Sequence, residues 1–412
     1  MQNNKLYWKL SSFFFLFFLS IASIFTFFAI WLGQSLHLSG AQTGIVFSVN
    51  AVFTMLFQPL YGYISDKLGL RKNLLYFISI LVILSGPFLI FIYQPLLNWN
   101  FWIGALTGGS YLAITFLAGI SAIESYIEKV GRKYEFEFGR ARLWGSIGAA
   151  VAAAIGGRML NINPDINFWI ASGSGILLLL VIFLTKVEVS TIEEKKAKSL
   201  SIQDLGSLFK RKDFWVFMIF MLGTGCIYNV FDQQFPVYYA SLFPTEQLGN
   251  QIFGYLNAGQ VFLESGMLLV APFIVRKVGP KGGLILAGII MILRVIGSGL
   301  VSDPYSISFI KLLNAPEFAI IIVSVFKYLA THFDTKDTKF SSILYLVGYQ
   351  FAMQLGAVIL SPIVGNLYDS IGFRQTYLIM GVIVTIFTLF GAFLLRNKNQ
   401  VSKDNNDSKL TA

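Results

Sequence analysis

Long apolar runs recur along the whole chain, and they constrain its fold more than any other feature of the sequence. A run of about 20 apolar residues is the length that an α-helix needs to cross the hydrocarbon core of a bilayer. Such a segment must satisfy its backbone polar groups internally, so it has to be a helix. We predict twelve spans, at residues 10–33, 43–64, 74–97, 101–126, 140–160, 167–185, 214–242, 249–275, 283–301, 306–330, 341–368 and 375–395. The expected fold is therefore an all-α membrane protein.

The composition agrees with a membrane protein along its whole length rather than a soluble domain with one anchor. Hydrophobic residues make up 55% of the 412 residues, and charged residues 13%. The net charge of +10 is explained by the orientation of the chain in the membrane, because Lys and Arg gather in cytoplasmic loops. With both termini cytoplasmic, Arg158 and Arg374 are the only basic residues placed on the opposite side. The charge therefore needs no nucleic-acid partner, and we expect a multi-pass protein with both termini cytoplasmic.

Polar stretches divide the predicted spans into two sets of six. Residues 186–213 form the longest polar stretch, and residues 396–412 form a polar tail. We therefore expect an N-terminal six-helix bundle at 1–185, a cytoplasmic linker at 186–213, a C-terminal six-helix bundle at 214–395 and a cytoplasmic tail at 396–412. Transporters built from internal repeats have this pattern. A weak repeat supports pseudo-symmetric halves, because Gly69 and Gly279 occupy matching basic loops after spans two and eight.

Seven of the ionisable side chains inside the predicted spans interrupt their apolar runs. A charge at the centre of a bilayer costs about 2.5–3.5 kcal/mol on insertion scales, so such residues pair in the protein interior and mark an ion or substrate path. They are Glu124, Arg142, Asp232, Glu264, Arg294, Lys311 and Glu317. The chain is therefore a candidate transporter.

The sequence offers little for an enzyme or a metal protein. It contains no HExxH or GxSxG motif, and its two histidines, His37 and His332, fall near span ends, where solvated loop residues are expected. Cys226 is the only cysteine, which excludes an intrachain disulfide and a cysteine metal cluster. We expect no catalytic residues, no metal and no cofactor.

The loop after the second span has a specific arrangement of glycines, an acid and bases. It reads GYISDKLGLRK, with Gly62, Asp66, Gly69, Arg71 and Lys72 as its distinctive residues. These residues resemble the loop signature of the major facilitator superfamily, where the loop changes conformation during transport. In physical terms, Asp66 can cap a helix end, Gly69 can adopt a positive φ, and the bases can face anionic lipid or a neighbouring helix. The other interpretation is a generic basic hairpin.

Four further segments are distinctive, and none of them is a general requirement of membrane helices. They read IEKVGRKYEFEFGRAR (residues 127–142), YNVFDQQF (228–235), GPKGGLILAGIIMILRVIGS (279–298) and KLLNAPEFA (311–319). They resemble the lactose, raffinose and sucrose permeases of the oligosaccharide:proton symporter family, and the similarity runs nearly end to end. The resemblance implies a monomeric carrier in a bacterial cytoplasmic (inner) membrane. It would take up a disaccharide or small oligosaccharide with protons by alternating access.

One acid and one base are candidates for sugar binding. Glu124 and Arg142 lie on consecutive spans that a short connection makes antiparallel neighbours. They can neutralise each other while they present a carboxylate and a guanidinium to sugar hydroxyls. By resemblance they are the central sugar-binding pair, and Glu264, Asn314 and Gln350 are further substrate-binding positions. The alternative is a purely structural ion pair.

The second half holds a candidate proton site. Glu317 lies in an apolar segment, which favours the protonated, neutral acid. An arginine that approaches it favours the anion and releases the proton. The resemblance implies that Glu317 carries the proton, Arg294 is its electrostatic switch, Tyr228 is a hydrogen-bonding neighbour, and Asp232 with Lys311 is a structural charge pair. The alternative is a fixed salt-bridge network without proton transfer.

Departures from the lactose permeases affect the expected sugar. Lactose permeases carry a glutamate at the position of Val261. The acid in this sequence is instead Glu264, about one helical turn and about 4.5 Å further along the helix axis. Asn229 and Met353 are neutral where lactose permeases have an Asp and Lys pair. These features, with the NFW segment at 167–169, favour the sucrose-permease branch. Sucrose is the expected sugar; the alternatives are lactose, melibiose, raffinose or a maltose-type sugar.

Two other departures concern the site itself. Ala149 stands where the family has an aromatic ring for stacking on the sugar, and Asn314 stands where it has a histidine. Asn can donate and accept hydrogen bonds but cannot titrate, so proton coupling cannot require that histidine. Other classes remain: a drug:proton antiporter, whose typical pocket is more apolar, and a transport-deficient sugar sensor, for which the linker and tail supply no obvious signalling domain.

Overall fold

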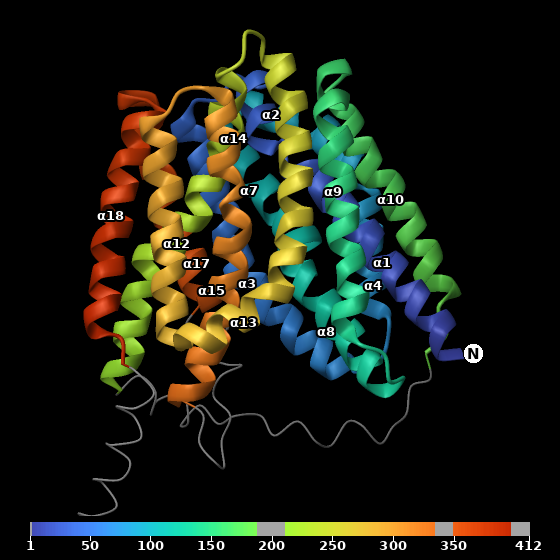
Figure 1. Ribbon diagram of the computed structural model, residues 1–412. Coiled ribbons are helices and arrows are strands. Elements are labelled where there is room, and N and C mark those ends of the chain that lie inside the picture. The colour runs from blue at the N-terminus through green and yellow to red at the C-terminus, as the bar shows by residue number, and fades with distance from the viewer. Residues whose placement is uncertain (1, 188–210, 334–348, 397–412) are drawn as a thin grey trace, which may run out of the picture. The chain divides into compact units, whose positions relative to one another are not determined.

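The computed structural model describes residues 2–187, 211–333 and 349–396, and these residues form helices without a strand (Figure 1). The helices of the first part are α1 (Gln2–Phe25), α2 (Phe28–Gln34), α3 (Gly40–Leu68), α4 (Asn73–Ile83), α5 (Ser85–Phe88), the π-helix η1 (Leu89–Tyr93), α6 (Gln94–Trp99), α7 (Phe101–Leu112), the π-helix η2 (Ala113–Leu117), α8 (Ala118–Lys133), α9 (Phe138–Ile162) and α10 (Asp165–Leu184). Those of the second part are α12 (Lys212–Ser241), α13 (Glu246–Leu300), α14 (Pro304–Leu312), α15 (Asn314–Phe333), α17 (Phe351–Ile371) and α18 (Phe373–Leu394). Most of the predicted linker, most of the predicted tail and residues 341–348 lie outside the described residues.

The described helices accommodate the predicted spans. Ten helical segments in this part of the chain are long and apolar enough to cross a membrane, and the bent pair Asn73–Ile83 with Ser85–Trp99 adds an eleventh. One of the ten, the 55-residue α13, consists of two helices joined at Gly279, whose φ is 79°. Counting its halves separately gives the twelve spans expected from the apolar runs. The prediction of an all-α membrane fold is therefore confirmed.

Local sequence explains where several helices begin and end. Ser39 and Gln42 form a capping box at the start of α3, in which each side chain accepts from the backbone N–H of the other. Asn100 caps α7 by accepting from two backbone amides. Gly69 ends α3 with a φ of 56°, and Gly279 has a positive φ at the corresponding place in the second half. Both glycines therefore adopt the backbone conformation that the matching loops predict.

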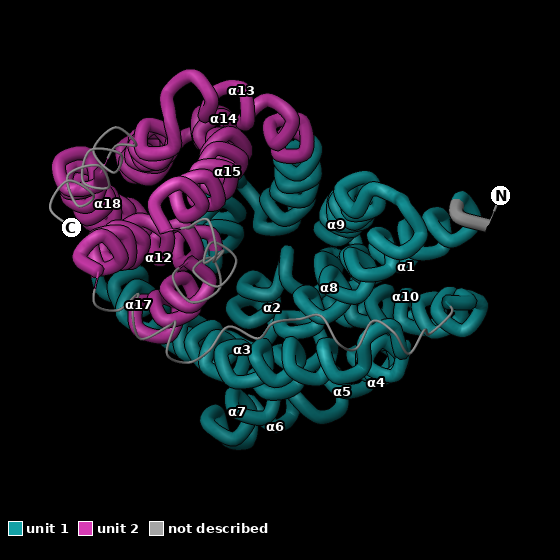
Figure 2. Tube along the Cα trace, turned by 90° about the horizontal axis from the view of Figure 1, so that it is seen from below, with its two compact units in different colours: residues 1–198, 233–262, 361–370 teal, residues 199–232, 263–360, 371–412 magenta. Residues whose placement is uncertain are grey.

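Packing divides the chain into two compact units (Figure 2). Unit 1 comprises residues 1–198, 233–262 and 361–370, and unit 2 comprises residues 199–232, 263–360 and 371–412. Unit 1 thus combines the N-terminal helices with parts of α12, α13 and α17. The two bundles expected from the sequence, at 1–185 and 214–395, are continuous segments of the chain, whereas each compact unit combines several segments. The two bundles therefore stay a prediction.

Polar contacts tie these later segments to the N-terminal helices within unit 1. The Asp369 carboxylate accepts hydrogen bonds from the amides of Gly40 and Ala41, at 2.7 and 2.8 Å. A carboxylate is favourable there because the N-terminus of α3 has unpaired N–H groups and a partial positive charge. Asn250 donates to the side-chain oxygen of Gln34 at 3.0 Å. Residues 361–370 and the start of α13 are therefore structural parts of unit 1.

The core of unit 2 lies between α12, α13 on both sides of Gly279, α15 and α17. It is built from buried aromatic and aliphatic side chains, among them Phe217, Phe220 and Tyr328. The rings of Phe217 and Tyr328 stack with centroids 5.7 Å apart. This apolar packing surrounds helices that also carry buried charges, so the charges depend on one another for partners.

Candidate functional site

An acid–base pair joins two neighbouring helices of unit 1. Only residues 134–137 separate α8 from α9, which makes the helices neighbours in the chain. Nε of Arg142 on α9 donates to Oε1 of Glu124 on α8 at 2.6 Å. Both side chains are 32% exposed. The predicted pairing is therefore observed, and the pair is accessible enough to meet a polar ligand.

The guanidinium of Arg142 also lies against aromatic rings of α1. Its Cζ is 4.0 Å from the ring centroid of Phe18 and 6.0 Å from that of Phe14. A guanidinium over an aromatic face is attracted by the ring quadrupole. Within the described residues its Nη groups have no hydrogen-bond partner. Arg142 thus has a fixed Nε contact, a stacked face and free donors.

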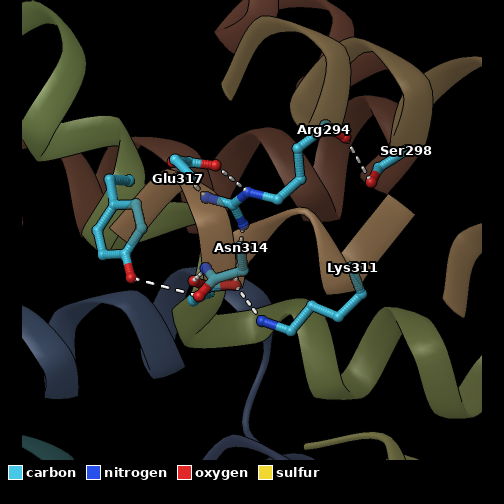
Figure 3. A network of polar contacts seen from close by, with 7 residues as sticks. Arg294, Ser298, Lys311, Asn314 and Glu317 are labelled. Carbon is cyan, nitrogen blue, oxygen red and sulfur yellow. Dashed lines mark hydrogen bonds and ion pairs between the residues drawn. The ribbon is translucent and has the colours of Figure 1, made fainter. Parts of the chain in front are cut away.

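A second, enclosed charge system lies in unit 2, where Arg294 of α13 meets Glu317 of α15 (Figure 3). Nε and Nη2 of Arg294 donate to the two carboxylate oxygens of Glu317 at 2.6 and 3.0 Å. The arginine side chain is 0% exposed and the glutamate side chain 1%. Two parallel bonds fix the relative orientation of both groups. The predicted approach of an arginine to this acid is therefore observed.

Asp232 of α12 extends this pair into a network. Its Oδ1 accepts from Nη1 of Arg294 at 3.2 Å and from Nζ of Lys311 at 2.5 Å. Its Oδ2 accepts from the side-chain amide of Asn314 at 2.8 Å. The network therefore contains two acids and two bases, so its formal charges cancel. The sequence predicted two pairs, and the structure joins them through Arg294.

Aromatic rings close the network on the α12 side. The hydroxyl of Tyr228 donates to Oδ1 of Asn314 at 3.4 Å. Cζ of Arg294 lies 5.4 Å from the centroid of Tyr228 and 4.6 Å from that of Phe231. Tyr228 is thus a hydrogen-bonding neighbour of the network, as predicted, although its direct partner is the asparagine.

The five predicted sugar-binding residues divide between the units. Glu124 and Arg142 belong to unit 1, whereas Glu264, Asn314 and Gln350 belong to unit 2. Glu264 is half-buried on α13. Gln350 is half-buried directly before α17, and Asn314 is 1% exposed with both polar atoms of its amide bonded. A sugar site shared by these five residues stays a prediction.

The loop signature after α3 makes contacts within unit 1. Asp66 forms an ion pair with Nζ of Lys129 at 2.8 Å and does not cap a helix. Lys72 donates to two carbonyls at the C-terminal end of α10, each at 2.8 Å. The carbonyl of Ile182 also accepts from the amide of Thr185 at 3.3 Å, so the lysine adds a charged donor at this helix end. The loop is thus anchored to α8 and α10 by its charged side chains.

The described residues contain no group of three His, Cys, Asp or Glu side chains that could hold a metal ion. Cys226 is buried and donates to the carbonyl of Ala352 at 3.1 Å.

The expectation that His332 is a solvated loop residue was wrong, because it is 4% exposed at the end of α15. Its ring nitrogens each lie 3.0 Å from a backbone carbonyl. A helix that continues to residue 333, beyond the predicted span, explains its burial.

The sequence did not single out Phe18 or Gly145. An ideal Cβ on Gly145 would lie 2.8 Å from Cδ2 of Phe18 and 3.2 Å from Nη1 of Arg142. Phe18 belongs to a run in which every residue from 13 to 18 is Phe or Leu, so the pattern cannot tell which ring faces an arginine. The one available signal was the position of Gly145 three residues after Arg142, on the same helix face.

Comparisons with known proteins cover almost the entire chain. A profile of the LacY proton/sugar symporter matches residues 1–406. The sucrose permease of Escherichia coli is 40% identical over 398 residues, covering 96% of this chain and 95% of the relative. The lactose permease of Klebsiella oxytoca is 40% identical over 382 residues, covering 91% of each chain. The crystal structure of the nucleoside transporter NupG superposes with a TM-score of 0.79 at 15% identity, covering 95% of this chain and 100% of NupG, and supports the fold alone.

Proposed function

We propose that this chain, which belongs to the LacY family of proton/sugar symporters, takes up a disaccharide together with a proton by alternating access. The family makes it a multi-pass membrane transporter of the major facilitator superfamily and not an enzyme. The uptake direction, the sugar and the roles of single residues are our proposals. They rest on one observation: the described chain holds an accessible acid–base pair and, separately, an enclosed charge network.

The accessible pair is the proposed sugar-binding site. Glu124 offers a carboxylate acceptor, and Arg142 offers donors that no described residue occupies. Sugar hydroxyls both donate and accept, so they match an acid next to a base. A planar guanidinium held in one orientation distinguishes hydroxyl geometries that a flexible ammonium cannot. The pair therefore suits directional recognition of a neutral polar ligand.

The enclosed network is the proposed proton site, with Glu317 as the proton carrier. Its carboxylate is bonded to Arg294 on both oxygens, which favours the anion. A movement that separates the two groups leaves the acid in apolar surroundings, where the neutral form is favoured. The geometry of α13 relative to α15 would then control proton uptake and release.

Sucrose is the proposed sugar, with lactose as the second candidate. The relatives named sucrose permease and lactose permease are equally similar to this chain. The position of Glu264 and the neutral Asn229 favour sucrose. The membrane is proposed to be the bacterial inner membrane, with both termini cytoplasmic and the carrier acting as a monomer.

Uptake of radiolabelled sugars into cells that express the protein tests this function. Accumulation of sucrose above the external concentration, lost when a protonophore collapses the proton gradient, is expected. Unlabelled sucrose or raffinose should compete better than lactose or melibiose. Stronger competition by lactose contradicts the sugar assignment only, whereas accumulation that survives the protonophore contradicts proton coupling.

A further inference from the structure

One face of α9 carries the proposed sugar-binding arginine, with Phe138 one turn before it and no aromatic ring after it. Arg142, Gly145 and Ala149 follow one another at helical spacing, three and four residues apart, and so share this face. Ala149, two turns from the arginine, supplies only a methyl group. Any ring that covers this face at Gly145 and beyond must therefore come from another helix.

Phe18 on α1 is that ring. In the run from Phe13 to Phe18, the rings of Phe13, Phe14 and Phe17 are fully buried, whereas Phe18 is half-buried. Its centroid is 4.0 Å from Cζ of Arg142, whose side chain is itself 32% exposed. The stacked ring and guanidinium thus lie together at an accessible surface of unit 1.

Gly145 makes this contact possible. A Cβ at this position would come within 2.8 Å of the Phe18 ring and 3.2 Å of Nη1 of the arginine. The first distance is too short for a real contact and the second is tight, so a larger residue would displace the ring and crowd the guanidinium. The absence of a side chain at position 145 therefore leaves room for the contact between the Phe18 ring and the Arg142 guanidinium.

We infer that Phe18 and Gly145 are positioning residues for sugar recognition: the ring holds the face of the Arg142 guanidinium while Glu124 holds its Nε. This inference rests on the proposed sugar-binding role of the pair. With one edge bonded to Glu124 at 2.6 Å and one face on the ring, the guanidinium has a single orientation, and its remaining donors point at the ligand. Preorganisation of this kind raises affinity because the side chain need not be ordered when the ligand binds.

Equilibrium binding of sucrose, and of lactose in parallel, to the purified full-length protein tests the inference. Phe18→Leu keeps an apolar side chain but removes the ring, and we expect about tenfold weaker binding, which corresponds to about 1.4 kcal/mol. Phe18→Tyr keeps the ring and should restore affinity to within about twofold, roughly 0.4 kcal/mol. The melting temperatures of both variants should stay close to that of the wild type.

Gly145→Ala tests the contact between Phe18 and Arg142 by a substitution on α9, and Gly139→Ala is its matched control. Both glycines lie on α9, but a Cβ at Gly139 would meet nothing within 4 Å. Gly145→Ala should weaken binding severalfold, and Gly139→Ala should leave it unchanged. Because alanine favours helix over glycine, neither substitution weakens the helix itself.

Three results would overturn the inference while the wild type still binds sugar. They are normal affinity in Phe18→Leu, equal losses in the leucine and tyrosine variants, or equal binding by the two glycine variants. A loss of affinity that follows a falling melting temperature would assign the ring to packing instead. If the wild type binds neither sugar, the proposed function fails first, and this inference fails with it.

Discussion

The two charge systems differ in how strongly the protein encloses them. Glu124 and Arg142 share one hydrogen bond and are each 32% exposed, so water and ligand can reach them. Arg294 and Glu317 share two hydrogen bonds and are at most 1% exposed, so protein groups are their only partners. An accessible pair can exchange partners at low cost. An enclosed pair holds its partner until a helix moves.

This difference matches the two tasks of a sugar/proton symporter. A sugar is large and must reach its site from water, so its binding groups have to be open in some state. A proton is small and must not leak, so its carrier benefits from a closed environment. The following predictions test whether enclosure separates the two systems, and they run from the largest expected effect on stability to the smallest.

Removal of Arg294 should have the largest effect. Arg294→Ala leaves the Glu317 carboxylate buried without its partner and takes one donor from Asp232, and breaking a buried pair from one side costs about 3–5 kcal/mol. Arg142→Ala should cost below about 1 kcal/mol, because solvent replaces the lost contact. Thermal unfolding of both variants in the same detergent measures this difference. Equal losses would show that exposure does not distinguish the two systems.

Glu317→Gln should be milder for stability and decisive for coupling. The amide keeps the shape and one acceptor but leaves the network with an excess positive charge, so we expect a loss of about 1–3 kcal/mol. The variant resembles the protonated state, so it should bind sugar and exchange it across the membrane without accumulating it. Counterflow and active uptake, measured in the same vesicles, separate the two activities.

Asp232→Asn serves as the matched control, because it removes the other acid of the same network and leaves the bonds from Arg294 to Glu317 in place. It should retain some accumulation. If Asp232→Asn abolishes accumulation while Glu317→Gln does not, the proton carrier is the aspartate.

Arg142→Lys and Glu124→Gln should have the opposite effects to Glu317→Gln. Each should change stability by below about 1 kcal/mol but abolish sugar binding. A lysine keeps the charge but neither the planar donors nor the stacking on Phe18. Glu128→Gln is the control on the same helix, since Glu128 pairs with Arg132 at 2.9 Å on an exposed surface. Binding near the wild-type level in Arg142→Lys would make the accessible pair structural.

Much of this arrangement could be predicted from the sequence, because membrane spans need long apolar runs and buried charges need partners. The helices begin and end within a few residues of most predicted spans, as α9 does at Phe138 and Ile162. Both expected contacts, Glu124 with Arg142 and Glu317 with Arg294, are observed. Their roles in sugar and proton binding stay predictions.

The remaining features depend on side-chain geometry that a linear pattern does not contain. The third contact of Arg294, to Asp232, depends on the direction of one guanidinium nitrogen. The choice of Phe18 from a run of apolar residues depends on the packing of α1 against α9. The contact of Asp369 with the start of α3 joins residues more than 300 positions apart, and an aspartate near a helix end has many equivalent partners in the sequence.

Asp66→Asn should have the smallest effect, and it extends the comparison to a third charge pair. Asp66 is 74% exposed and Lys129 22%, and the lysine also lies 3.2 Å from the carbonyl of Ser65. The asparagine should therefore change stability by below about 0.5 kcal/mol, because solvent replaces one contact and the lysine keeps another. Lys129→Met should cost more, since it removes the contacts with Asp66 and with the carbonyl and hydroxyl of Ser65 together. Thermal unfolding should thus rank the variants by exposure: Arg294→Ala, then Arg142→Ala, then Asp66→Asn. A loss of more than about 2 kcal/mol in Asp66→Asn, beyond the range for an exposed pair, would show that the loop stabilises the fold through something other than this ion pair.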